Sequence, residues 1–105
     1  MTLPHLTPED RAAALDKAVD ARRRRAEFKE CLKRGELTLA DVLERAQSDE
    51  VVSRTPILTV LESMPGIGKV KASRIMERVG ISESRRVRGL GAKQRVALSD
   101  ELAGR

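Results

Sequence analysis

Two runs of apolar residues, each spaced as in a helix, meet at Pro65-Gly66-Ile67-Gly68-Lys69-Val70-Lys71-Ala72. Proline cannot continue a helix, because it lacks an amide N–H and clashes with the preceding turn. Glycine accepts a positive φ, so it lets the chain reverse direction. We therefore predict two short helices joined by a tight turn. Their apolar positions are Ile57, Leu58, Val60, Leu61 and Met64 before the turn, and Val70, Ala72, Ile75, Met76 and Val79 after it.

The start of the second helix offers a site for a phosphate group. The first N–H groups of a helix have no intrahelical partner and lie at the positive end of its dipole, so they bind anions. Gly66 and Gly68 let another backbone come close, and Lys69 and Lys71 are near them in the chain. We therefore expect a helix–hairpin–helix that grips a nucleic-acid backbone. The plain alternative is a turn that joins two helices and binds nothing.

A chain of 105 residues with one Phe and no Trp or Tyr must build its core from aliphatic side chains. This length suits one domain with one modest core. Strong helix formers dominate the composition, and no alternating run of β-branched residues indicates a strand. We predict an all-α fold in which a long N-terminal helix docks on a small helical domain. Residues 1–35 are expected to form the arm and long basic helix, and residues 36–105 the helical domain.

Charge and composition narrow the classes of function. The net charge of +5 and the pI of about 10.0 favour a polyanionic partner. The mean hydropathy is −0.39, and neither a membrane-spanning run nor a secretory signal is visible, so we expect a cytoplasmic protein without a membrane partner. Cys31 is the only cysteine and His5 the only histidine. We therefore expect no intramolecular disulfide, metal site, cofactor or histidine-based catalysis.

A long helix is predicted near the N-terminus. Thr7-Pro8 provides a cap and a proline suited to the first helical position, and Gly35 is placed to end the helix. About 27 residues would span about 40 Å. Its apolar groups lie on opposite faces, so we expect the C-terminal part to dock and the N-terminal part to project. These groups are Leu15, Val19 and Ala26 on one side, and Phe28, Cys31 and Leu32 on the other.

Four consecutive arginines occupy the middle of this helix. They point all round the helix axis, so they cannot all be buried. Two interpretations stay open, a solvated helix face and a surface that binds phosphates. The run consists of Arg22, Arg23, Arg24 and Arg25.

Shorter helices are predicted on either side of the glycine turn. Thr38 and Asp41 match a capping box for a helix that ends near residue 47. A second Thr-Pro start at residue 55 opens the helix that runs to the glycine turn, whereas residues 51–54 are too short to assign. The helix after the turn is expected over residues 69–79, and Gly80 suits the left-handed position that ends it.

A basic loop follows over residues 82–91. Its serines and arginines are not committed to a helical face, so they can converge on one surface, while Val87 and Leu90 anchor the loop inward. A last helix is expected over residues 92–102, with Val96, Leu98 and Leu102 facing the core. The polar side chains of the loop that we single out are Ser84, Arg85, Arg86 and Arg88.

The order of helix, P-G-I-G-K-V-K-A, helix, R-R-V-R-G-L-G and helix resembles the helix–two-turn–helix module. This module occurs in a small-subunit ribosomal protein and in formamidopyrimidine-type DNA glycosylases. The chain as a whole is more similar to the actinobacterial integration host factor family. The likeness includes the L-P-x-L-T-x-E-x-R-A-A-A-L start and the arginine-rich first helix. The shared segments are residues 3–15, 22–34, 61–76 and 81–91.

This resemblance implies a nucleoid-associated protein that binds double-stranded DNA with low sequence specificity. It also implies DNA bending or bridging, effects on supercoiling and compaction, and assistance in phage integration. Integrase and topoisomerase are the protein partners that it suggests, and we expect a monomer in solution. By analogy, one DNA backbone lies along Gly66, Gly68, Lys69 and Lys71. The same duplex meets Ser84, Arg85, Arg86 and Arg88. A second DNA surface is formed by Arg22, Arg23, Arg24 and Arg25.

Other functions fit the sequence less well. Gly68-Lys69 resembles part of a phosphate-binding loop, but Ser63 and Val70 stand where that motif requires Gly and Ser or Thr. A glycosylase would need a catalytic domain, for which 105 helical residues leave no room, so we predict no enzyme. Single-stranded nucleic acid is disfavoured because stacking aromatic residues are missing. Structured RNA, such as ribosomal RNA, stays open as the alternative ligand, and so does a pure protein-interaction domain.

Overall fold

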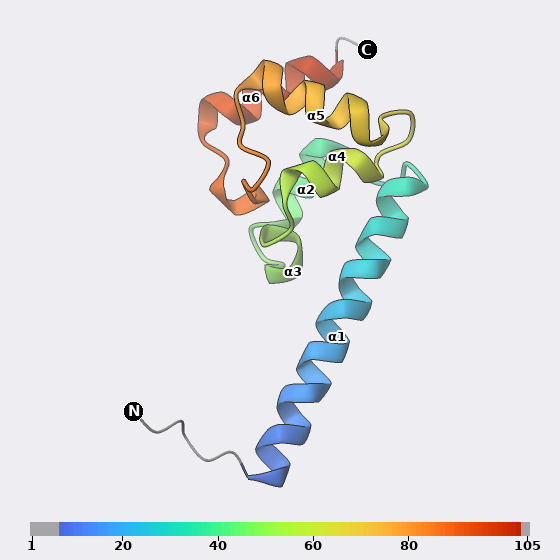
Figure 1. Ribbon diagram of the computed structural model, residues 1–105, viewed down its shortest axis with the longest axis vertical. Coiled ribbons are helices and arrows are strands. Elements are labelled where there is room, and N and C mark those ends of the chain that lie inside the picture. The colour runs from blue at the N-terminus through green and yellow to red at the C-terminus, as the bar shows by residue number, and fades with distance from the viewer. Residues whose placement is uncertain (1–6, 104–105) are drawn as a thin grey trace.

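Six α-helices and one short 3-10 helix make up residues 7–103, the part of the chain that the computed structural model describes. Within these residues no strand forms, and the all-α prediction is confirmed (Figure 1). The helices are α1 (Pro8–Lys33), α2 (Leu39–Arg45), α3 (Glu50–Ser53), α4 (Ile57–Ser63), α5 (Gly68–Val79), the 3-10 helix η1 (Val87–Gly89) and α6 (Ala92–Ala103). His5 lies outside the described residues.

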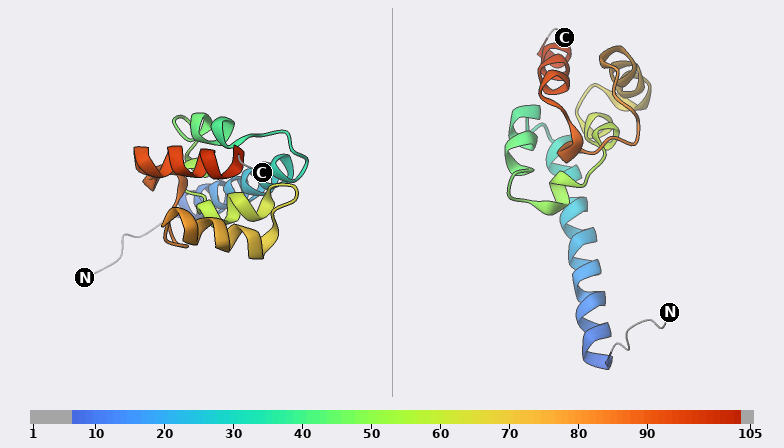
Figure 2. Two further views of the ribbon diagram at one scale, coloured as in Figure 1. Left: turned by 90° about the horizontal axis from the view of Figure 1, so that it is seen from above. Right: turned by 90° about the vertical axis from the view of Figure 1, so that its left-hand side faces the viewer.

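Helix α1 projects from the other helices, as its split apolar pattern predicts (Figures 1 and 2). Thr7 and Asp10 form a reciprocal capping box, with the Thr7 hydroxyl accepting from the Asp10 amide at 3.0 Å. Residues 8–19 are exposed along their whole length, whereas Phe28 and Leu32 are buried in the core. The C-terminal part of α1 packs against α3 and α4, so only this part is held by tertiary contacts.

Helices α2 and α3 are fixed at their N-termini by side chains. Thr38 and Asp41 form the predicted capping box of α2, and the hydrogen bonds from Thr38 hold the pKa of the Asp41 carboxyl below its usual range. The short helix α3 falls where the sequence pattern gives no assignment. Its start is set by the Asp49 carboxylate, which accepts from the Val51 and Val52 amides at 3.0 and 3.4 Å.

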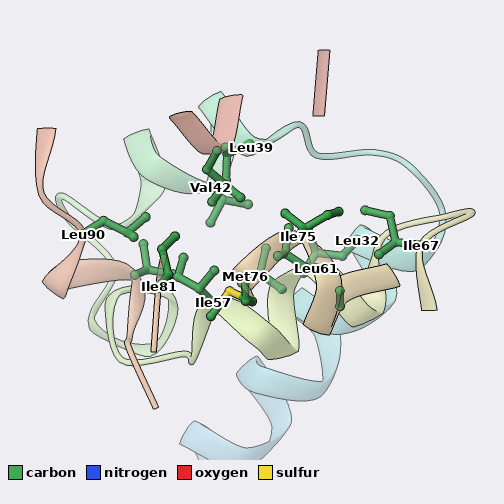
Figure 3. Packing of buried hydrophobic residues seen from close by; sticks show 14 of the residues in the cluster. Leu32, Leu39, Val42, Ile57, Leu61, Ile67, Ile75, Met76, Ile81 and Leu90 are labelled. Carbon is green, nitrogen blue, oxygen red and sulfur yellow. The ribbon is translucent and has the colours of Figure 1, made fainter. Parts of the chain in front are cut away.

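Helices α4 and α5 pack against each other on either side of the glycine turn. Their buried side chains meet those of α1 and α2 in one hydrophobic core, which is aliphatic except for Phe28 (Figure 3). The predicted inward positions are confirmed except for Val70, which is 67% exposed, because it lies on the face of α5 opposite Ala72 and Met76. The fully or almost fully buried residues of the pair are Ile57, Val60, Leu61, Ala72, Ile75 and Met76.

The chain after α5 follows the predicted course with one correction. Gly80 has φ 79°, and the Ile81 amide donates to Met76 O at 2.9 Å, which completes a Schellman motif. In α6 Leu98 is buried, but the prediction that Val96 faces the core is wrong, since Val96 is 61% exposed. Two positions apart on a helix differ by about 200°, so Val96 and Leu98 cannot both face inward. No helix within residues 7–103 is long and apolar enough to span a bilayer.

Candidate nucleic-acid interface

The glycine turn between α4 and α5 presents its backbone to solvent. Gly66 and Gly68 have φ values of 79° and 69° and are exposed, and a Cβ atom at either position would lie in open space. The residue between them, Ile67, points the other way and is 7% exposed. The turn is therefore anchored in the core by one side chain, while its glycine backbone is open to close approach by a ligand.

The N-terminus of α5 differs from those of α1, α2 and α3. These three helices have a side-chain cap and an acidic residue in the first turn, whereas α5 has neither. Its first turn carries Lys69, which is exposed, and Lys71, whose Nζ lies 3.4 Å from Gly66 O. The positive end of the α5 dipole is thus left without an internal anion and is flanked by two lysines, which favours an external anion such as phosphate.

The arginine loop, residues 82–91, is fixed to the start of α4 by backbone hydrogen bonds. The Ile57 amide donates to Arg85 O, and the Val87 amide donates to Thr55 O, each at 2.9 Å. Val87 and Leu90 are buried, as predicted. Pro56 and Arg86 thus form an isolated antiparallel bridge, which ties the polar side chains of the loop to the start of α4.

The polar side chains of this loop are not equivalent. Arg85 donates from Nη1 to Gly89 O at 3.1 Å and so braces η1. Ser84 Oγ lies 3.0 Å from Ser82 Oγ. Arg86 and Arg88 are exposed and make neither a side-chain hydrogen bond nor an ion pair with residues 7–103. Their guanidinium groups are therefore the ones in this loop with all donors available to a ligand.

The glycine turn and the arginine loop lie at opposite ends of α5 (Figure 1). A helix of 12 residues is about 18 Å long, which is several times the 3.4 Å rise per phosphate along one DNA strand. The two segments therefore cannot bind one phosphate group together. The glycine turn and the arginine loop are both exposed. A duplex that contacted both segments would do so through phosphates several positions apart along its strand.

The arginine run of α1 is only partly available. Arg23 pairs with Asp20 at 2.6 Å, and Arg24 pairs with Asp49 at 3.0 Å. Arg22 and Arg25 form no ion pair with residues 7–103. The sequence prediction treats the four arginines alike, whereas the structure commits two of them to neighbouring carboxylates.

A cleft of about 740 Å³ brings part of this run together with the arginine loop. It lies between α1, α3 and the residues that join α3 to α4. No sequence motif singles out Lys17 or Arg54 or indicates that Arg86 meets α1, because no local pattern links positions so far apart in the chain. The cationic residues that line the cleft are Lys17, Arg24, Arg25, Arg54 and Arg86.

Known proteins resemble this chain along most of its length. Residues 32–102 match the model of the S13-like H2TH domain. The integration host factor of Streptomyces coelicolor is 54% identical over 102 residues, covering 97% of this chain and 95% of its own, and that of Mycobacterium tuberculosis is 52% identical, with 97% of each chain covered. This chain belongs to the actinobacterial integration host factor family.

A solved structure of the family also has this architecture. It is described as sIHF bound to an 8-bp palindromic DNA, and it matches with a TM-score of 0.77 at 50% identity, covering 82% of this chain and 97% of its own. The family and the helix–two-turn–helix module that the sequence motifs indicate are thus confirmed. Residues 7–103 contain no group of three or more His, Cys, Asp or Glu side chains placed to hold a metal ion.

Proposed function

We propose that this protein binds double-stranded DNA through its backbone phosphates, with low sequence specificity. The observation that carries the proposal is the uncapped N-terminus of α5, opened by two exposed left-handed glycines and flanked by lysines. The free guanidinium groups of the arginine loop add cationic donors at the other end of the same helix. The sIHF–DNA structure supports this assignment, because it shows a relative of the same fold with a duplex bound.

The chemistry of these groups explains the low specificity. Peptide N–H groups and serine hydroxyls bind phosphate oxygens next to any base, so they position a duplex without reading its sequence. Arginine binds phosphate through two parallel N–H donors, or enters a narrow minor groove whose potential is strongly negative. We therefore expect a preference for DNA shape over DNA sequence. The residues in these roles are Gly66, Gly68, Lys69, Lys71, Ser84, Arg85, Arg86 and Arg88.

In the cell this activity would serve nucleoid organisation. Phosphate contacts at both ends of α5 and on α1 can offset the few kcal/mol needed to bend a short duplex, or they can link two duplexes. Effects on supercoiling, compaction and phage integration follow from either action, with topoisomerase and integrase as protein partners. We further propose that the protein acts in the cytoplasm as a monomer and is not an enzyme.

Structured RNA is the second candidate ligand. The description of the matching domain model as S13-like favours it, because the same module occurs in a ribosomal protein. The A-form helix of RNA also presents phosphates, but its wide, shallow minor groove offers no narrow negative channel for arginine. Direct competition between the two ligands separates these functions.

A salt titration on a labelled linear duplex tests the proposed function. We expect the logarithm of the binding constant to fall linearly with the logarithm of the salt concentration, by about 0.9 per phosphate contact. Two dyes at the duplex ends report bending in the same sample, and unlabelled structured RNA serves as the competitor. Binding that is independent of salt, or RNA that displaces the duplex at equal concentration, would contradict the assignment to DNA.

Replacing Gly68 by alanine is expected to weaken duplex binding about tenfold to a hundredfold. The added Cβ meets nothing in the free protein but projects where a phosphate must approach, and φ 69° costs alanine about 1–2 kcal/mol of stability. Gly80→Ala is the matched control, because it has φ 79° at the other end of α5 and equally open space. Duplex affinity and thermal unfolding are measured for both, and equal affinities would argue against the amide grip.

A further inference from the structure

We infer that the cleft between α1 and the arginine loop receives the backbone of the same duplex that the arginine loop contacts. Of the α1 run, only Arg24 and Arg25 line the cleft, so these two then extend one continuous binding surface, whereas Arg22 and Arg23 lie outside it. This inference rests on the proposed function and goes beyond it by assigning the cleft to a single duplex.

The first argument is the direction of the α1 side chains. Lys17, Ala21, Arg24 and Arg25 all line the cleft, and their spacing of four, three and one residues places them on one face of the helix. From Lys17 to Arg25 this face runs for about 12 Å, which covers roughly three to four phosphates of a DNA strand. A row of cations of this length suits a stretch of backbone better than a single anion.

The second argument is the state of the acidic residues in the cleft. Two carboxylates line it, and both are already paired within the protein: Asp20 with Arg23 at 2.6 Å and Glu50 with Arg54 at 2.5 Å. Lys17, Arg25 and Arg86 form no ion pair within residues 7–103. The charge left uncompensated around the cleft is therefore positive, and it comes from both walls.

The third argument is continuity with the arginine loop. Arg86 lines the cleft together with the α1 side chains, and Arg88 stands two residues further along the same loop. A DNA strand that meets Arg88 is therefore close in the chain to Arg86, which belongs to the cleft. If α1 bound a different duplex, the two backbones would approach each other at this cleft and repel.

Asp49 links two of the helices that form the cleft, α1 and α3. Its carboxylate caps α3 and also accepts from Arg24 Nη2 at 3.0 Å, with the Asp49 side chain 28% exposed. One group therefore joins the wall formed by α3 to the wall formed by α1. Asp49 is a positioning residue in this scheme, because it holds Arg24 of α1 beside the start of α3.

The test compares Arg25→Ala with Arg22→Ala, since both residues belong to the run and are exposed, but only Arg25 lines the cleft. Binding to one duplex of about 16 bp is measured by fluorescence anisotropy, with the duplex limiting, over a range of salt concentrations. We expect Arg25→Ala to weaken 1:1 binding about tenfold and to lower the salt slope by about one. Arg22→Ala should change neither, and Arg25→Lys should restore the slope.

A bridging assay on the same variants decides between one surface and two. Capture of a free labelled duplex on a surface-bound duplex measures whether one protein links two DNA molecules. The inference is overturned if Arg25→Ala leaves 1:1 binding and its salt slope unchanged while abolishing capture. It is also overturned if Arg25→Ala and Arg22→Ala behave alike in 1:1 binding. If the wild-type protein itself binds no duplex at low salt, the proposed function fails. That outcome differs from the two above, in which the wild-type protein binds DNA but the cleft is not part of the binding surface.

Discussion

Replacing Arg86 and Arg88 together by alanine is expected to weaken duplex binding more than a hundredfold. Both guanidinium groups are exposed and have no internal partner, so their full donor capacity is available to phosphate oxygens. A hydrogen bond to a charged group contributes about 1.5–3 kcal/mol, and the loss of two such contacts removes about 3 kcal/mol or more of binding free energy. The slope of binding against salt should fall by about two. Anisotropy with a labelled duplex measures both quantities.

The control for this double variant removes the same charge elsewhere. Arg11→Ala combined with Arg22→Ala removes two charges from α1, and neither residue lines the cleft or belongs to the arginine loop. Its affinity should fall much less, because only the long-range attraction to DNA is reduced. Arg85 is left unchanged in both variants, since its bond to Gly89 O supports η1. Equal losses in the two variants would mean that net charge, and not the loop, determines binding.

Leu32→Ala is expected to destabilise the protein by about 2–5 kcal/mol. Leu32 is fully buried and carries the end of α1 into the core beside Leu61 and Ile75 (Figure 3). The substitution removes this apolar contact and leaves a cavity that the surrounding helices fill only in part. Small domains have unfolding free energies of about 5–15 kcal/mol, so a large share of the stability is at stake. Urea unfolding followed by circular dichroism measures the change.

Leu15→Ala provides the matched comparison for this core variant. It makes the same chemical change on the same helix, but Leu15 is 64% exposed on the projecting half. The unfolding free energy should change by less than about 0.5 kcal/mol. A Leu15 variant as unstable as the Leu32 variant would show that the first half of α1 packs against something in solution.

Local signals made most of the fold predictable. The Thr7-Pro8 start, the two capping boxes and the glycine stops mark helix ends through interactions within a few residues, and each is found where the sequence indicates. The second Thr-Pro start is wrong, because Pro56 is itself the N-cap of α4 and the Thr55 hydroxyl donates to Val51 O instead of capping the helix. Val70 and Val96 are apolar but exposed, because their angle around the helix axis turns them away from the core. Both lie about 200° from a buried neighbour two positions away.

The candidate site was predictable only in its separate parts. The glycine turn and the arginine loop are local motifs, and their exposure agrees with the sequence interpretation. The cleft depends on where α1 crosses α3, which tertiary packing decides. The same packing pairs Arg24 with Asp49, a residue that no motif in the sequence singles out. No spacing rule links residues that are 25 positions apart on different helices.

The attachment of residues 85–87 to residues 55–57 has a consequence for the thermodynamics of recognition. Many basic segments that bind nucleic acid are unstructured when free, and ordering them opposes binding through lost conformational entropy. Here the two backbone bonds at 2.9 Å order the segment during folding of the chain itself. Association with DNA should therefore proceed with little change in helical content and a small heat-capacity change, and be driven mainly by release of counterions.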